Sequence, residues 1–151
     1  MRRFICIIAL AAALAPALQA GEAKVIKVLP QYLDTKGRNS LSPSLYERDA
    51  YQAHLRKNPD LRSALTFVVQ WKAHGVHWDK MKIRVEIRGV ASNTTEVETL
   101  EQPVRKTGWF SHWSRLQLDG KALEKLGQVS AWRVTLWEEG RQLGEKKSFL
   151  W

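Results

Sequence analysis

Apolar and polar side chains alternate along much of the chain after residue 62, with the period of two that is typical of β-strands. The clearest case runs from Met81 to Arg88, where every second residue is apolar and the residues between them are charged. Such a strand turns one face to a core and the other to water. Ser63 to Trp71 contains an unbroken apolar stretch, which indicates a central strand. Similar runs predict further strands over residues 94–100, 109–118, 129–137 and 142–151.

The first part of the chain predicts one strand followed by one helix. Residues 24–29 are rich in β-branched side chains and are followed by Pro30, which favours a strand at a sheet edge. Residues 34–39 form a polar link. A helix is then predicted over residues 43–57, because Ser44 and Glu47 have capping-box spacing and Asn58-Pro59 ends the pattern.

These elements predict a mostly β fold: an antiparallel seven-stranded sandwich with one inserted α-helix between the first two strands. Short spacing between turns favours a sandwich over an alternation of strands and helices. One helical turn is also expected over residues 121–126, before the sixth strand. Residues 21–151 form a single β-sandwich domain in this prediction, and a domain of this length can bury a substantial core.

Residues 1–20 have the pattern of a secretory signal peptide. Arg2 and Arg3 precede an apolar run over residues 4–14, and Ala20 is the small residue expected before the cleavage site. The run is shorter than the roughly 20 residues of a membrane-spanning helix, so we expect no membrane span after cleavage. Cys6 is the only cysteine and lies in this segment, so the mature domain forms no disulfide. We therefore expect a secreted or periplasmic bacterial protein.

The charge and the motifs argue against several classes of function but do not identify one. The formal net charge is +9, or +7 once Arg2 and Arg3 are removed, but the basic residues are scattered. Scattered basic residues do not indicate a nucleic-acid-binding role. The sequence contains no nucleophile elbow and no phosphate-binding glycine-rich loop. We therefore predict a non-enzymatic protein without a cofactor.

The order of the elements resembles an immunoglobulin or fibronectin type III sandwich, including the short helical link and the final hairpin. The resemblance is architectural, because the chain lacks the Cys…Trp…Cys framework and carries an unusual inserted helix. The blocks PSLYERDAYQAHLR and AWRVTLW…SFLW also resemble a family of uncharacterised exported bacterial proteins. That resemblance implies a location outside the cytoplasm, and it does not indicate any particular activity.

The helix carries the first candidate site, a partner-binding surface. Tyr46, Ala50 and Ala53 lie on one side of it, whereas Tyr51 and Leu55 lie nearly opposite, although a helix on a sheet normally shows one apolar stripe. One side is therefore available for a partner, with Tyr46, Tyr51 and Leu55 as candidates. The leading hypothesis is an exported binding or assembly module that contacts another protein of the cell envelope.

The tryptophans supply a second candidate site. The chain has seven, of which Trp71 and Trp132 are expected in the core. Trp109 and Trp113 share one strand face and could form an aromatic platform with Trp78. Aromatic faces stack on sugar rings, so the alternative hypothesis is a carbohydrate-binding module, with core packing as the simpler explanation.

The histidines supply a third and weaker candidate. His74 and His77 have H-x-x-H spacing, and His112 could approach them in the fold. Three imidazoles with one open position can hold a catalytic metal. The corresponding hypothesis is a metal-dependent hydrolase, although ordinary surface histidines explain the same pattern.

Overall fold

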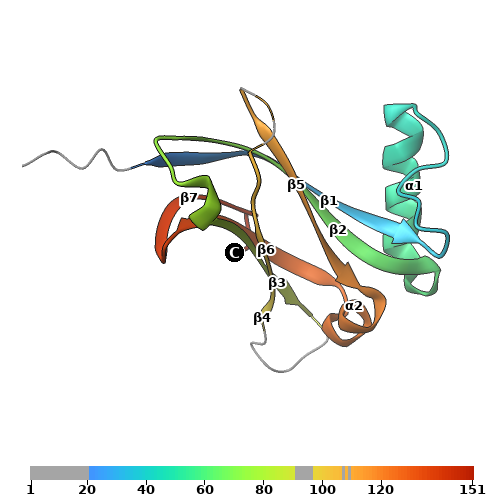
Figure 1. Cartoon of the computed structure of the whole chain (residues 1–151). Coiled ribbons are helices and arrows are strands. Elements are labelled where there is room, and N and C mark those ends of the chain that lie inside the picture. Colours follow the sequence, from blue (N-terminus) through green and yellow to red (C-terminus); the bar gives the residue numbers. More distant parts are fainter. Residues whose placement is uncertain (1–20, 91–96, 107, 109) are drawn as a thin grey trace, which may run out of the picture.

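The computed structural model describes residues 21–90, 97–106, 108 and 110–151, and it confirms the mostly β class. Within these residues seven antiparallel strands form two sheets that pack face to face (Figure 1). One sheet has the order β1-β2-β5, with β1 (Glu22–Asp34), β2 (Arg62–His74) and β5 (His112–Asp119). The other has the order β4-β3-β6-β7, with β4 (Val97–Pro103), β3 (Met81–Gly89), β6 (Val129–Glu138) and β7 (Arg141–Lys147).

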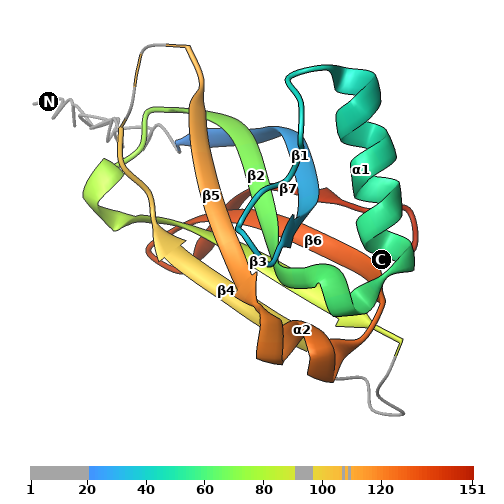
Figure 2. The same cartoon turned by 90° about the vertical axis from the view of Figure 1, so that its right-hand side faces the viewer.

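Two α-helices connect the strands. The predicted helix is α1 (Leu45–Lys57), which lies between β1 and β2 in the chain and stands beside β1 (Figure 2). Ser44 is its N-cap, but the Ser44 side chain makes no capping hydrogen bond, so the predicted capping box does not form. The expected turn before the sixth strand is a second helix, α2 (Gly120–Leu126), whose N-cap Asp119 accepts a hydrogen bond from the Ala122 N–H at 2.9 Å. Two 3-10 turns, η1 (Pro59–Leu61) and η2 (Trp78–Lys80), precede β2 and β3.

The core lies between the sheets and follows the predicted alternation. Along β3 every second side chain from Met81 to Ile87 is buried. The central position expected for the second strand is confirmed, because β2 pairs with β1 on one side and β5 on the other. Its buried run is continuous from Ala64 to Phe67. The largest fully buried side chains are Trp71, Phe67, Leu55, Leu65, Met81, Ile83, Ile87 and Leu136.

The N-terminal strand is at a sheet edge, as predicted, but it continues through Pro30 to Asp34. A proline is tolerated in an edge strand because its missing N–H can fall on the side that has no neighbouring strand. The beginning of β1 approaches β7 closely: a Cβ atom added at Gly144 would lie 2.4 Å from the Ala23 carbonyl oxygen. Glycine is therefore required there for the two sheets to meet at this corner.

Candidate functional site

Helix α1 turns one face to the sandwich, and this face contains two of the three predicted partner-binding residues. The Leu55 side chain is fully buried. Tyr51 is half-buried and its hydroxyl donates a hydrogen bond to Asp34 Oδ2 at 2.7 Å. Arg48, Tyr51, Gln52 and Leu55 follow helical spacing along this face. The structure therefore turns Tyr51 and Leu55 toward the sandwich and leaves Tyr46 on the outside.

Gln52 is the main anchoring residue of α1, and no local sequence pattern indicates it. Its Oε1 atom accepts a hydrogen bond from the Tyr32 N–H at 2.8 Å, and its Nε2 atom donates to the Tyr32 carbonyl at 2.9 Å. The same Nε2 atom donates to the Asn39 carbonyl at 2.8 Å. The buried carboxamide thus pairs with Tyr32 as a neighbouring strand would. Glutamine is normally a surface residue, so only its tertiary contacts distinguish it.

Asp34 joins the end of β1 to the following turn and to α1. Its carboxylate accepts hydrogen bonds from the backbone N–H groups of Lys36 and Arg38, from the Arg38 guanidinium and from the Tyr51 hydroxyl. Burial alone would raise the pKa of Asp34, but these four sets of bonds outweigh it and hold the pKa well below its usual range. The group is therefore ionised and fixes the helix to the sandwich.

Exposed apolar side chains gather at the beginning of α1. Leu41 is 63% exposed, Leu45 64% and Tyr46 83%. Scattered exposed apolar residues are common, whereas exposed apolar residues that form one patch mark interaction sites. We call this group the α1 tip. Tyr46 is the one predicted partner-binding residue that it contains, and Leu41 and Leu45 were not among the candidates from the sequence.

The predicted aromatic platform is not assembled from Trp78 and Trp113. The Trp78 ring packs 6.0 Å from the Trp71 ring and 4.8 Å from the His112 ring, between centroids. His112 faces inward from β5, whereas Trp113 faces outward and is 52% exposed. Trp78 and Trp113 therefore lie on opposite sides of β5. Trp109, the third predicted member, lies outside the described residues.

A groove borders the exposed Trp113. Residues 102–105, at and after the end of β4, form one wall, and residues 113–115 of β5 form the other, enclosing about 390 Å³. Arg105 and Arg115 are exposed there and form no ion pair with any described residue. We call it the β5 groove; it offers one aromatic face and two positive charges.

The three histidines do not form a metal site. His74 is exposed at the end of β2, and His77 is exposed with its Nδ1 atom 3.1 Å from Glu138 Oε1. His112 is buried, with its ring 4.7 Å from the Trp71 ring. Across the residues that the structure describes, no group of three histidine, cysteine, aspartate or glutamate side chains could hold a metal ion. The hydrolase hypothesis therefore lacks the convergence of ligands that it needs.

Glu138 is a buried carboxylate that was not among the candidates from the sequence pattern. It accepts hydrogen bonds from the His77 N–H at 2.7 Å and from the Arg141 guanidinium at 2.9 Å. The backbone bond from His77 contributes most and, with the Arg141 bond, lowers the pKa of Glu138 from 4.5 to about 2, against the opposing effect of burial. Its bonds hold the loop before β3 to the end of β6.

Glu138→Gln is expected to reduce stability at pH 5 by more than at pH 3. A carboxyl whose pKa is lowered by folding stabilises the native state above its unfolded pKa, and this contribution is lost as the pH falls toward the folded pKa. The difference between wild type and variant in the free energy of unfolding should therefore shrink from pH 5 to pH 3. Urea unfolding at both pH values measures it. A difference that stays constant or grows would show that Glu138 is not held as an ionised acceptor.

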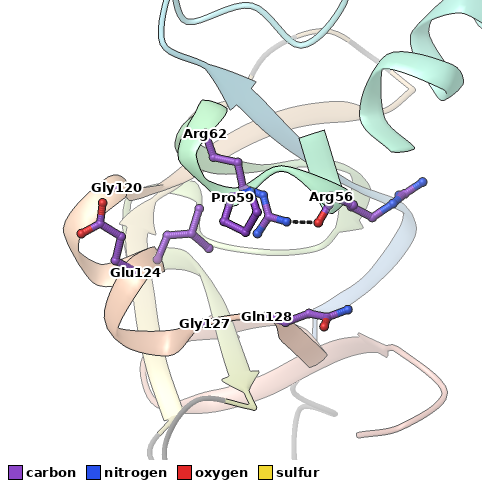
Figure 3. A pocket seen from close by; sticks show the side chains of 8 residues that line it. Arg56, Pro59, Arg62, Gly120, Glu124, Gly127 and Gln128 are labelled. Atoms are coloured by element: carbon purple, nitrogen blue, oxygen red, sulfur yellow. Dashed lines mark hydrogen bonds between the residues drawn. The ribbon is translucent and has the colours of Figure 1, made fainter. Parts of the chain in front are cut away.

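A second pocket lies between the end of α1 and α2 (Figure 3) and encloses about 260 Å³. Pro59 and Leu123 supply apolar walls, and Arg56 and Glu124 supply opposite charges. Arg62 also lines it, but its guanidinium already donates to the carbonyl groups of Leu55 and Arg56 and caps α1. Of the polar side chains around this pocket, Arg62 is thus used to hold the end of α1.

Comparisons with known proteins do not identify a function, so the function is argued from the geometry described above. No family model matches the chain, and no curated protein or solved structure is significantly similar to it. No helix among residues 21–90, 97–106, 108 and 110–151 is long and apolar enough to cross a membrane.

Proposed function

We propose that this protein is an exported, non-enzymatic binding or assembly module that contacts another protein of the bacterial cell envelope. The signal-like pattern of residues 1–20 supports export. The order of the strands in the two sheets supports the resemblance to immunoglobulin and fibronectin type III sandwiches, a scaffold that serves many unrelated functions. Function therefore depends on the surfaces that this scaffold presents.

The α1 tip is the observation that carries the proposal. Leu41, Leu45 and Tyr46 remain exposed although the opposite face of the same helix is firmly anchored through Gln52 and Leu55. An apolar group on a rigid helix loses little entropy when it binds. Tyrosine is among the residues that contribute most to protein interfaces. The expected partner is a protein with an apolar depression that receives Tyr46 and Leu45.

Site-specific cross-linking tests this surface. The whole chain is produced with its own N-terminal segment and with Tyr46→benzoylphenylalanine, illuminated in cells, and the cross-linked protein is identified by mass spectrometry. Phe149→benzoylphenylalanine is the matched control, because Phe149 is fully exposed at a distant position of the sequence. A protein cross-linked through position 46 and not through position 149 is expected.

Binding of the identified protein should depend on the same side chains. The pair Leu45→Ala and Tyr46→Ala should weaken binding by about tenfold or more, because it removes two interface side chains. The pair Phe149→Ala and Leu150→Ala, also adjacent and exposed, should leave binding unchanged. Equal binding by both double variants, or cross-linking only to other copies of this chain, would contradict the proposal.

Carbohydrate binding is the alternative function, and the β5 groove is what favours it. The half-exposed Trp113 ring lies beside Gln102, Arg105 and Arg115, which could bond to hydroxyl or carboxylate groups of a glycan. A glycan array probed with wild type and Trp113→Ala tests it. Binding that the variant loses would support this function, and no bound glycan would end it.

A further inference from the structure

The two sheets have four edge strands, which are β1 and β5 in one sheet and β4 and β7 in the other. An edge strand presents unpaired backbone N–H and C=O groups that can pair with another chain, and proteins usually hinder this with prolines, bulges, charges or a covering segment. Each of the four edges is therefore expected to show at least one such form of protection.

Three of the four edge strands contain a proline or a register shift. Strand β1 has a register shift between Val25 and Lys27, contains Pro30, and has both polar backbone groups of Tyr32 occupied by Gln52. Strand β4 ends in Pro103 and carries glutamates. Strand β7 has a register shift opposite β6 and lies against the beginning of β1, where Lys146 Nζ donates to the Ile26 carbonyl at 2.6 Å.

Strand β5 carries two charged residues, Arg115 and Asp119, but neither a proline nor a bulge. Its residues pair with β2 one for one, without a register shift, and its sequence contains no proline. Among the described residues no strand pairs with its other edge. In an antiparallel pair alternate residues direct their N–H and C=O groups away from the partner strand. Strand β5 therefore presents a regular row of backbone groups, and the β5 groove runs along part of it.

The side chains beside this edge indicate the chemistry of an added strand. Trp113 and Arg115 lie two residues apart on the outward face, so the side chains of a neighbouring strand would fall beside them in turn. Trp113 favours an apolar neighbour and Arg115 a carboxylate, and Arg105 adds a second positive charge at the opposite wall. The positive net charge of the protein would also attract an acidic segment.

We propose that the free edge of β5 binds an extended, acidic segment of a partner protein by strand addition. The segment pairs with the backbone of β5 and places alternating apolar and acidic side chains beside Trp113 and Arg115. Backbone pairing supplies affinity and these two side chains supply selectivity, as in other cases of strand addition. The site is separate from the α1 tip and does not depend on it.

Selection from a peptide library tests the proposal while the partner is still unidentified. The probe is a display library of random peptides of about ten residues, which is the length of a long strand, panned against the purified protein. Enriched peptides should carry an apolar residue and an acidic residue two positions apart, because the side chains beside Trp113 and Arg115 lie on one face of the added strand. Arg115→Glu and Trp113→Ala should each weaken their binding about tenfold or more. The Leu45→Ala and Tyr46→Ala pair, which lies outside β5 and its groove, should leave it unchanged.

Two further measurements distinguish strand addition from contact through side chains alone. Peptide binding should slow amide hydrogen exchange at alternate residues from 113 to 118. Two peptides are methylated on their backbone nitrogens, one at the odd-numbered residues and the other at the even-numbered residues. One pattern should abolish binding and the other should be tolerated, because only alternate N–H groups face β5.

Several outcomes would overturn the proposal. These are no enrichment, selection of basic peptides, binding unaffected by Arg115→Glu and Trp113→Ala, or equal tolerance of both methylation patterns. Binding of a polygalacturonate oligomer through Trp113 in the absence of any enriched peptide would assign the groove to an acidic glycan instead. Circular dichroism and urea unfolding establish that each variant is folded.

Discussion

Trp71→Ala is expected to lower the free energy of unfolding by about 3–5 kcal/mol, the range for truncation of a large aromatic residue in a core. Trp71 is fully buried, its ring packs against Trp78 and His112, and its Nε1 atom donates to Ser114 Oγ at 3.0 Å. The substitution leaves a cavity between the sheets and an unpaired hydroxyl. Because small domains are stabilised by only about 5–15 kcal/mol, this loss is a large fraction of the total stability.

Trp113→Ala is the matched control for this prediction. Trp113 pairs in register with Gln70, next to the pair formed by Trp71 and His112, but its side chain faces solvent. Its truncation should cost about 1 kcal/mol or less. Urea unfolding followed by circular dichroism measures both variants. A loss at Trp71 no larger than that at Trp113 would mean that the strand faces are assigned wrongly.

Gln52→Ala is expected to cost about 2–4 kcal/mol, because it leaves the N–H and C=O groups of Tyr32 and the C=O group of Asn39 without partners. A buried polar group that loses its partner costs about 1–3 kcal/mol. A groove lined by Leu29 and Arg48, among others, adjoins Gln52. Water entering from this groove can bond to the unpaired groups, so the total cost is expected to be less than three times the largest single cost. Equilibrium urea unfolding measures the loss.

Gln52→Glu should show a distinct dependence of stability on pH. The glutamate can still accept from the Tyr32 N–H, but its second oxygen would face two carbonyl oxygens, so folding should raise the pKa of the introduced carboxyl. A carboxyl with a raised pKa makes the folded state bind more protons than the unfolded state, so stability falls as the pH rises. The variant should therefore gain stability relative to Gln52→Ala between pH 7 and pH 5.

Glu47→Gln is the control on the same helix, because Glu47 is exposed. It should change the free energy of unfolding by about 0.5 kcal/mol or less at either pH. If Gln52→Ala were as mild as this control, the contact between Gln52 and Tyr32 would not anchor α1. The proposed rigidity of the α1 tip would then lose its physical basis.

The two proposed surfaces differ in how they would act. The α1 tip offers apolar side chains on an anchored helix, so its affinity would come mainly from burial. The free edge of β5 offers backbone groups and positive charge, so its binding would weaken with salt. One partner could use both, since they belong to different parts of the sandwich, and the variants proposed above separate their contributions.

Local patterns of residues were enough to predict the class of fold and the order of its elements. The alternation of Met81–Arg88, the apolar run before Trp71 and the turn residues between strands each act locally, so their periods can be recognised without a structure. The edge position of the first strand followed from Pro30 for the same reason. These predictions of fold class, edge strand and central strand are confirmed.

Which surfaces are free could be known only from the folded chain. The apolar residues on both sides of α1 did not show whether Tyr46 or Leu55 faces the sandwich, because the choice depends on the pairing of Gln52 with Tyr32, distant in sequence. The outward position of Trp113 and the absence of a neighbour for β5 among the described residues depend likewise on which strands pair. Such long-range pairings determine burial, and a local pattern of residues does not contain them.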